Sequence, residues 1–146
     1  MRRPHLEQLF PNLQSSEYSV ESEPTDSYNC IAWAAGVTDK WWWPVEEEDS
    51  YWPIEIGAAS LEAFTNAFAT LGYEPCADGW LEGGFEKVAI YAGRNEIPTH
   101  MARQLRSGVW TSKCGGLEDI THTLEALEGE VYGRVAQILR RPITQS

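Results

Sequence analysis

The sequence predicts an α+β fold in which N-terminal helices pack on a small antiparallel sheet. In the first half, two segments that begin with good N-cap residues have helix-compatible apolar runs, residues 30–35 and 60–71. In the second half, strand-like runs are separated by turn residues. A chain of 146 residues suits a single domain, residues 1–146, built around one hydrophobic core.

Net charge and cysteine content restrict the function classes. The 22 acidic and 11 basic side chains give a net charge of −11, which repels a phosphate backbone, so we expect no nucleic-acid partner. No run approaches the roughly 18 to 20 apolar residues that span a bilayer, and the first residues lack the apolar segment of a signal peptide. We therefore expect no membrane association and a cytoplasmic location. Cys30, Cys76 and Cys114 lack the spacing of a metal site or a disulfide set, so we expect free thiols, no metal and no cofactor.

Cys30 lies at the start of a short apolar helix. Asp26, Ser27 and Asn29 are all good N-cap residues, and Gly36 is suited to end the helix. A cysteine in the first turn lies in the positive end of the helix dipole, which favours the thiolate and lowers the thiol pKa. The pattern predicts a nucleophile. The alternative is a packing residue, because free cysteine is often buried for that reason alone.

The segments around this helix are predicted to be arms and loops. Residues 6–13 have a helical apolar face that a proline limits, and residues 14–25 read as a solvated connector. Three consecutive tryptophans, residues 41–43, precede an acidic loop of residues 46–49. One interpretation is an aromatic wall beside the cysteine. We prefer the other, a long loop pinned to the core by large anchors.

The remaining elements follow in order. Residues 60–71 form the clearest helix, and residues 73–77 a short strand. Three consecutive antiparallel strands are predicted next, at residues 85–92, 99–105 and 109–114. Apolar residues at helical spacing predict a third helix over residues 117–127. The segment 131–139 fits either a helix or a strand, and we favour a closing strand.

A thiol nucleophile needs a base, and histidine is the usual one because its pKa lies near neutrality. His100 opens a predicted strand and can face a helix N-terminus packed on that sheet. His5 lies in a terminal arm, and His122 lies in the predicted third helix, where a surface position is expected. His100 is therefore the candidate base, and the alternative is a hydrogen-bonded structural histidine.

Hairpin register decides which side chains share the face of His100. A three-residue loop, residues 106–108, suits a glycine at its last position and pairs Leu105 with Val109. This register places three side chains on the side of His100: Trp110, Ser112 and Cys114. A two-residue loop would place Thr111 and Lys113 there instead. We prefer the first register, with Ser112 as the group that orients His100 and Asp119 as the runner-up.

Two further roles stay open at this point. The backbone N–H of Cys30 and a neighbouring donor from Asn29 or Tyr28 would stabilise an oxyanion, although Asn29 can equally be only the helix cap. A redox pairing of Cys30 with Cys114 is conceivable, but no spacing requires it.

The order of helix-borne cysteine, second helix, sheet and strand-borne histidine resembles the papain-like superfamily of cysteine hydrolases, which includes NlpC/P60 and transglutaminase-like enzymes. The matching residues are Cys30, within Tyr-Asn-Cys-Ile-Ala-Trp-Ala, and His100, after the strand at 87–91. The resemblance implies a papain-like fold with Cys30 as nucleophile and His100 as base. Such enzymes usually carry an orienting polar group on the next strand, which here has no acid.

The chain is also similar to a set of bacterial proteins that share three segments. These are Tyr-Asn-Cys-Ile-Ala-Trp-Ala at 28–34, Thr-His-x-Ala-Arg-Gln-Leu at 99–105 and Gly-x-Trp-Thr-Ser-Lys at 108–113.

Two hypotheses follow. The first is a cysteine hydrolase or acyltransferase that acts on an amide or thioester of a small-molecule or peptide substrate. The second is a non-catalytic, immunity-like protein that binds a basic partner protein through its tryptophan-rich loop and acidic rim.

Overall fold

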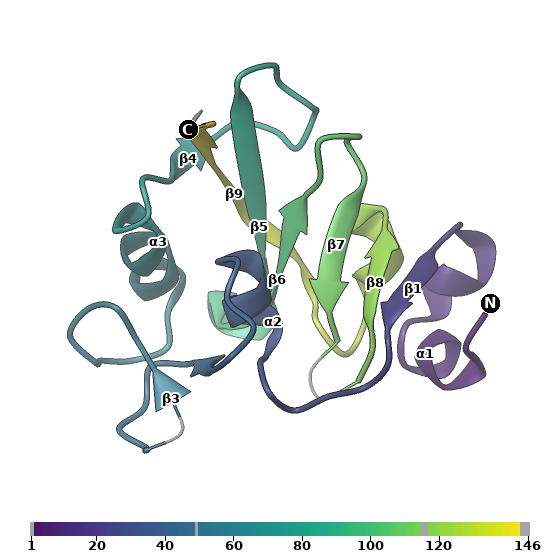
Figure 1. The fold of residues 1–146 in the computed structure, drawn as a ribbon, viewed down its shortest axis with the longest axis horizontal. Coiled ribbons are helices and arrows are strands. Elements are labelled where there is room, and N and C mark those ends of the chain that lie inside the picture. Colours follow the sequence, from purple (N-terminus) through teal and green to yellow (C-terminus); the bar gives the residue numbers. More distant parts are fainter. Residues whose placement is uncertain (1, 49, 115–116, 144–146) are drawn as a thin grey trace.

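A seven-stranded antiparallel sheet with strand order β1-β8-β7-β6-β5-β9-β4 forms the centre of the computed structural model, which describes residues 2–48, 50–114 and 117–143. Its strands fan across the middle of the molecule (Figure 1). They are β1 (Ser19–Ser22), β4 (Glu74–Cys76), β5 (Phe85–Ala92), β6 (Pro98–Gln104), β7 (Trp110–Lys113), β8 (Asp119–His122) and β9 (Arg134–Pro142).

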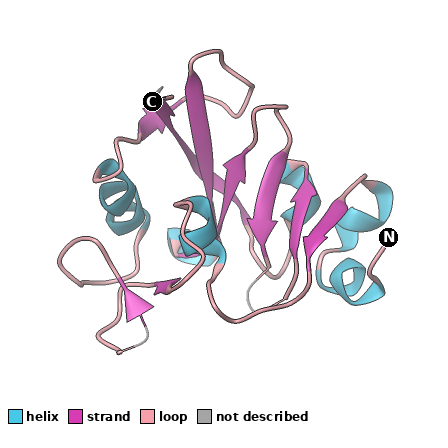
Figure 2. Ribbon diagram, in the orientation of Figure 1, coloured by secondary structure: helices cyan, strands magenta, loops and turns pink. Residues whose placement is uncertain are grey.

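Helices are short in this fold. The α-helices are α1 (Pro4–Leu9), α2 (Cys30–Ala34) and α3 (Leu61–Ala69), and the 3-10 turns are η1 (Pro11–Ser15), η2 (Arg94–Glu96) and η3 (Leu124–Leu127). Strand predominates over helix (Figure 2). The predicted papain-like α+β class, with N-terminal helices on a small sheet, is therefore wrong, because the fold is much richer in β-structure. In the described part of the chain, no helix is long and apolar enough to cross a membrane.

Two segments account for much of the difference. The predicted helix over residues 117–127 is strand β8 followed by η3, and β8 extends the sheet by pairing Ile120 with Ser112 of β7. The alternating, β-branched sequence Asp-Ile-Thr-His suits a strand, and the neighbouring edge of β7 outweighs the helical spacing of the apolar residues. The supposed connector of residues 14–25 contains β1, which pairs with β8.

Other predictions are confirmed. Helix α3 begins after Ser60, whose hydroxyl oxygen accepts a hydrogen bond from the Ala63 N–H at 3.0 Å. Strands β5, β6 and β7 are consecutive and antiparallel, and the segment after η3 does form the strand β9. The Leu105 N–H bonds to the Val109 carbonyl at 2.7 Å, which is the register that a three-residue hairpin loop requires.

Each face of the sheet carries its own hydrophobic cluster. Helices α2 and α3 cover the face formed by four central side chains: Val88, Ile90, Met101 and Leu139. In Figure 1, α2 lies in front of the sheet beside β6. The N-terminal arm and η3 cover the opposite face, whose members include Ala89, Tyr91, Ala102, Trp110 and Ile120. Side chains alternate between the faces along each strand, so neighbouring residues belong to different clusters.

The tryptophan-rich segment forms a separate two-stranded ladder of β2 (Trp41–Trp42) and β3 (Ser50–Tyr51), which pair in parallel. Trp42 and Trp52 are buried against the aromatic rings of α3, with ring centroids 6.0 Å from Phe68 and 5.0 Å from Phe64 respectively. The preferred interpretation of a loop pinned by large anchors is therefore confirmed. Asp49 of the acidic loop lies outside the described residues.

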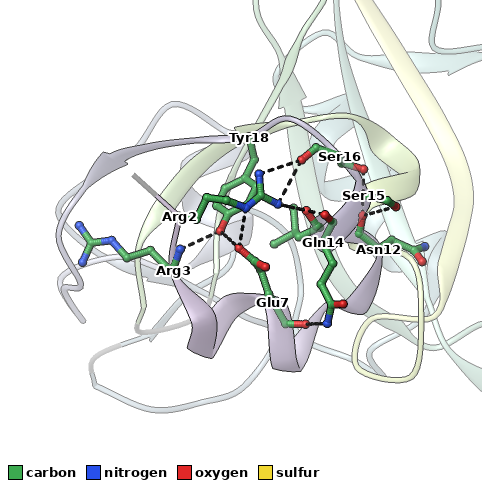
Figure 3. Close-up of polar contacts among 9 residues, drawn as sticks. Arg2, Arg3, Glu7, Asn12, Gln14, Ser15, Ser16 and Tyr18 are labelled. Carbon is green, nitrogen blue, oxygen red and sulfur yellow. Dashed lines mark hydrogen bonds and ion pairs between the residues drawn. The ribbon is translucent and has the colours of Figure 1, made fainter.

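Polar contacts fold the N-terminal arm on itself (Figure 3). The Arg2 guanidinium pairs with Glu7 at 3.0 Å and donates to the carbonyl oxygens of Leu13, Gln14 and Ser16. The Tyr18 hydroxyl donates to Glu7 at 2.6 Å and, as the largest cause, lowers the pKa of that carboxyl. These contacts hold α1 against η1, so the apolar residues of both cover one face of the sheet.

Candidate functional site

The site begins with the cap of α2. The Asn29 side-chain oxygen accepts from the Ala32 N–H at 3.1 Å and from the Trp42 N–H at 3.0 Å, and its amide donates to the Trp42 carbonyl at 2.9 Å. Asn29 thus caps the helix and pins the tryptophan ladder to it. The Tyr28 hydroxyl donates to Asp119 at 2.8 Å. Both side chains proposed as oxyanion donors are therefore engaged in structural contacts.

Cys30 is the first residue of α2, and its thiol is buried. Burial raises the thiol pKa to about 11, even though the backbone N–H groups of Met101, Ile31 and Cys30 itself hydrogen-bond to the sulfur and lower it. The predicted lowering of the pKa is wrong. A helix of five residues has a weak dipole, and desolvation of the thiolate outweighs it.

The contact with Met101 locates the sulfur relative to the sheet. Leu105 donates its N–H to β7, and alternate N–H groups of an antiparallel strand point the same way, so those of Arg103 and Met101 also face β7. Paired residues of β6 and β7 end at Arg103 and Thr111. Beyond that pair, the Met101 N–H lies near the Cys30 sulfur and lowers the thiol pKa. The thiol therefore lies where β6 and β7 separate.

A cavity of about 500 Å³ opens beside this thiol. Its walls come from the α2 cap, the tryptophan ladder and two residues near β6, and its lining residues are Asn29, Cys30, Trp41, Trp43, Val45, Glu47, Ser50, Thr99 and Tyr132. Trp41 and Trp43 therefore form an aromatic wall beside Cys30, while Trp42 points into the core. The aromatic wall therefore consists of Trp41 and Trp43, and the anchor in the core is Trp42.

His100 is fully buried, and its side chain lies on the opposite face of the sheet from α2. Its ring stacks on Tyr132, with centroids 3.9 Å apart and planes at 11°, and meets the edge of Tyr91. Its Nε2 atom lies 2.9 Å from Ser112 Oγ. Among the described residues its Nδ1 atom has no hydrogen-bond partner. Burial, and secondarily the neighbouring His122, hold the pKa of His100 well below its usual range.

Ser112 is the polar neighbour of His100, as the hairpin register predicts. The runner-up, Asp119, lies elsewhere and accepts hydrogen bonds from Tyr28 and Ser22. His122 also lies 2.6 Å from Ser112 Oγ through its own Nε2. The expected surface position of His122 in a helix is wrong, because it ends strand β8 with 1% of its surface exposed.

The side chains of Cys30 and His100 lie on opposite faces of the sheet. In residues 2–48, 50–114 and 117–143, no hydrogen bond joins the sulfur to the His100 ring. Tyr132 connects the two, because it lines the Cys30 cavity and stacks on His100. The Cys114 thiol is buried nearby on the His100 face, and electrostatic repulsion from Cys30 adds to the burial that raises its pKa well above the usual range.

Some contributors to the site were missed by the sequence analysis. The Met101 N–H carries no sequence signal, since every residue except proline has one. Tyr132 lies in the segment whose secondary structure was ambiguous, and only the tertiary contact reveals it. Another histidine, His5, pairs instead with the buried Glu118 at 2.9 Å. No cluster of three or more metal-ligating side chains occurs among the described residues.

The described residues thus form an antiparallel sheet with a buried thiol at a helix start on one face and a histidine–serine–histidine chain on the other. The chain is a member of the family defined by a domain of unknown function, DUF7689, whose model matches residues 19–140. The matched region contains all the residues of the candidate site. No protein of curated function and no solved structure matches this chain.

Proposed function

We propose that this protein is a cysteine-dependent hydrolase or acyltransferase that acts on an amide or thioester, with Cys30 as nucleophile and His100 as base. The observation that carries the proposal is the His100 Nδ1 atom, a buried nitrogen without a hydrogen-bond partner among the described residues. Buried polar atoms are usually paired, and an unpaired nitrogen of a neutral imidazole is free to accept a proton. A bare imidazole nitrogen on the residue before Met101, whose backbone N–H lies near the Cys30 sulfur, would supply the base that a cysteine nucleophile needs.

The protonation states require the thiol proton to move together with the attack, because its transfer from a high-pKa thiol to a low-pKa imidazole is unfavourable by itself. Burial raises the pKa of the thiol and lowers the pKa of the imidazole, so both groups are neutral at pH 7. His100 Nδ1 would take the thiol proton as the sulfur forms its bond to the substrate carbonyl carbon. The resulting imidazolium would return that proton to the leaving amine or thiol as its bond to the carbon breaks. Water or a second nucleophile would then release the acyl group from Cys30.

Backbone donors around the sulfur support this chemistry. The backbone N–H groups of Met101, Ile31 and Cys30 lie near enough to the sulfur to lower the thiol pKa. A carbonyl carbon bonded to that sulfur would bring its oxygen into the same group of donors, which would stabilise an oxyanion. The donors would thus be backbone groups of α2 and β6 rather than the side chains of Asn29 and Tyr28.

Tyr132 would control the approach of the two groups. Its ring lines the cavity and covers His100, so a substrate in the cavity would displace the ring and bring the thiol and Nδ1 into line. The cavity of about 500 Å³ suits a small molecule or one side chain of a peptide.

The test is an acyl-transfer assay with p-nitrophenyl acetate and an acetyl thioester, monitored by product release and by intact-protein mass spectrometry. We expect an acetyl adduct on Cys30. The variants Cys30→Ala and His100→Ala should lose turnover while circular dichroism shows a folded protein, and Cys76→Ala, the matched control, should retain it. Undiminished turnover in Cys30→Ala, or an adduct on another residue only, would overturn the proposal.

A second candidate function is supported by the surface next to this cavity. Trp41 and Tyr51 line a polar cavity of about 760 Å³ together with four acidic side chains, Asp26, Asp39, Glu47 and Glu48. Lys40 Nζ, a cation of the chain itself, lies 4.9 Å from the centre of the Tyr51 ring on this surface. A basic partner protein would match this surface and the net charge of −11.

Charge reversal separates this second function from the first. The Glu47→Lys/Glu48→Lys double variant should lose salt-sensitive binding of fluorescent poly-lysine, whereas Glu55→Lys/Glu130→Lys, on exposed residues outside this cavity, should retain most of it. Equal loss in both double variants would assign the binding to net charge alone and would contradict a specific surface.

A further inference from the structure

His122 is a buried histidine whose hydrogen bonds fix its protonation. Its Nδ1 atom lies 2.7 Å from the Thr123 carbonyl oxygen. A carbonyl oxygen can only accept, so this nitrogen carries the proton. Burial lowers the pKa of His122 to about 4, so the ring is neutral at pH 7 and its Nε2 atom is a bare acceptor.

Ser112 links the fixed protonation of His122 to that of His100. Its hydroxyl group is fully buried and lies 2.6 Å from His122 Nε2 and 2.9 Å from His100 Nε2. A hydroxyl has one proton, and the bare nitrogen of His122 must receive it. The Ser112 oxygen is then an acceptor toward His100, and the His100 Nε2 atom must donate.

The tautomer of His100 follows. A neutral imidazole carries one proton, so a proton on Nε2 leaves Nδ1 bare. This is the atom that has no partner among the described residues. The hydrogen bond from His122 to the Thr123 carbonyl therefore determines, through Ser112, which nitrogen of the His100 ring is unprotonated.

We propose that His122 is a positioning residue that acts through Ser112 to hold His100 in the tautomer with a proton on Nε2 and a lone pair on Nδ1. The use of that lone pair to accept the Cys30 proton rests on the proposed function, whereas the tautomer itself does not. His122 touches neither substrate nor sulfur in this scheme. Its effect is transmitted by the direction of a single hydroxyl proton.

The arrangement has a specific consequence for substitution. If position 122 lacks an acceptor, the Ser112 hydroxyl proton is free to turn toward His100 Nε2. That nitrogen must then be bare, and the one proton of the neutral ring moves to Nδ1. Glutamine keeps an acceptor oxygen at position 122, whereas phenylalanine removes it at similar bulk.

The experiment is nitrogen-15 NMR of the histidine rings in the labelled full chain, which distinguishes protonated from bare ring nitrogens directly. In the wild-type protein we expect His100 to be protonated on Nε2 and His122 on Nδ1. His122→Phe should move the His100 proton to Nδ1, and His122→Gln should leave it on Nε2. The His5→Gln variant assists assignment and should change neither ring.

Two results would overturn the inference. One is a wild-type His100 protonated on Nδ1, and this measurement needs no variant to fold. The other is a folded His122→Phe protein in which His100 keeps its proton on Nε2.

The acyl-transfer assay separates this inference from the proposed function. If Nδ1 is the base, His122→Phe should lower kcat by up to about 10⁴-fold with little change in KM, because a wrong tautomer disables a base without removing it. His122→Gln should restore most of the activity. Wild-type rings in the expected tautomers, together with full activity in Cys30→Ala, would reject the proposed function and leave the tautomer assignment standing.

Discussion

The two faces of the sheet stabilise two different kinds of buried group. On the α2 face, Trp41 and Trp43 line the cavity beside the Cys30 thiol, and aromatic rings of α3 pack against the tryptophans. On the other face, His100, Ser112 and His122 form a continuous hydrogen-bonded chain among apolar side chains. The thiol is kept neutral by desolvation with few partners, whereas the histidines are kept neutral by desolvation and a fixed proton order. One strand, β6, contributes to both arrangements, because the Met101 backbone N–H lies near the Cys30 sulfur while the His100 side chain bonds to Ser112 on the other face.

The largest expected effect comes from breaking the aromatic packing on the α2 face. Phe64 is fully buried and contacts Trp43 and Trp52, with ring centroids 5.4 and 5.0 Å away. Phe64→Ala should lower the free energy of unfolding by about 3–5 kcal/mol, as measured by urea denaturation. It should also speed alkylation of Cys30 by iodoacetamide, because Trp43 lines the cavity. Unchanged alkylation with lowered stability would show that Trp43 does not shield the thiol.

The stability of the folded chain at acidic pH depends on the buried His122. The pKa of His122 falls from 6.5 to about 4 on burial, so between these values the unfolded chain binds a proton that the folded chain does not. Stability should therefore be complete above pH 6.5 and decrease as the pH falls toward 4, by about 3 kcal/mol from His122 alone. Urea unfolding at a series of pH values measures this slope. His122→Gln should have a shallower slope, and an equal slope in that variant would contradict the assignment.

The stability of the folded chain at alkaline pH depends on the Cys30 thiol, and here stability falls as the pH rises. The pKa of Cys30 rises from 9.0 to about 11 on burial, so between these values the folded chain keeps a proton that the unfolded chain has lost. Stability should decrease as the pH rises from 9 to 11, by about 2–3 kcal/mol from Cys30. Cys30→Ser removes this contribution and should have a smaller alkaline loss. If both proteins lose the same stability, the thiol is not desolvated as the structure indicates.

The smallest expected effect concerns the helix caps that hold the α2 face. Ser60 bonds one backbone N–H of α3, so Ser60→Ala should cost about 1 kcal/mol in thermal or urea unfolding. Asn29 caps α2 and also bonds both backbone groups of the buried Trp42. Asn29→Ala should therefore cost more than Ser60→Ala, because it leaves buried groups unpaired. Equal costs would mean that the Trp42 contacts add nothing to the cap.

The sequence by itself determined the elements whose signals are local. The Ser60 cap and apolar stripe define α3, Asn29 and the apolar run define α2, and the glycine of the hairpin loop sets the register that places Ser112 beside His100. Each depends on residues within a few positions of one another, where propensity and turn geometry act. The helix-start position of Cys30 and the pairing of His100 with Ser112 were therefore predictable from the sequence.

Only the tertiary structure decided the rest. The segment around His122 becomes a strand because the edge of β7 is there to pair with it, and β1 forms because β8 then offers an edge in turn. The pKa of Cys30 is set by how much of the chain packs over it, which no local dipole reveals. Whether His100 and Cys30 share a face depends on the side of the sheet that α2 covers. These outcomes depend on contacts between residues far apart in sequence, which local secondary-structure propensity cannot predict.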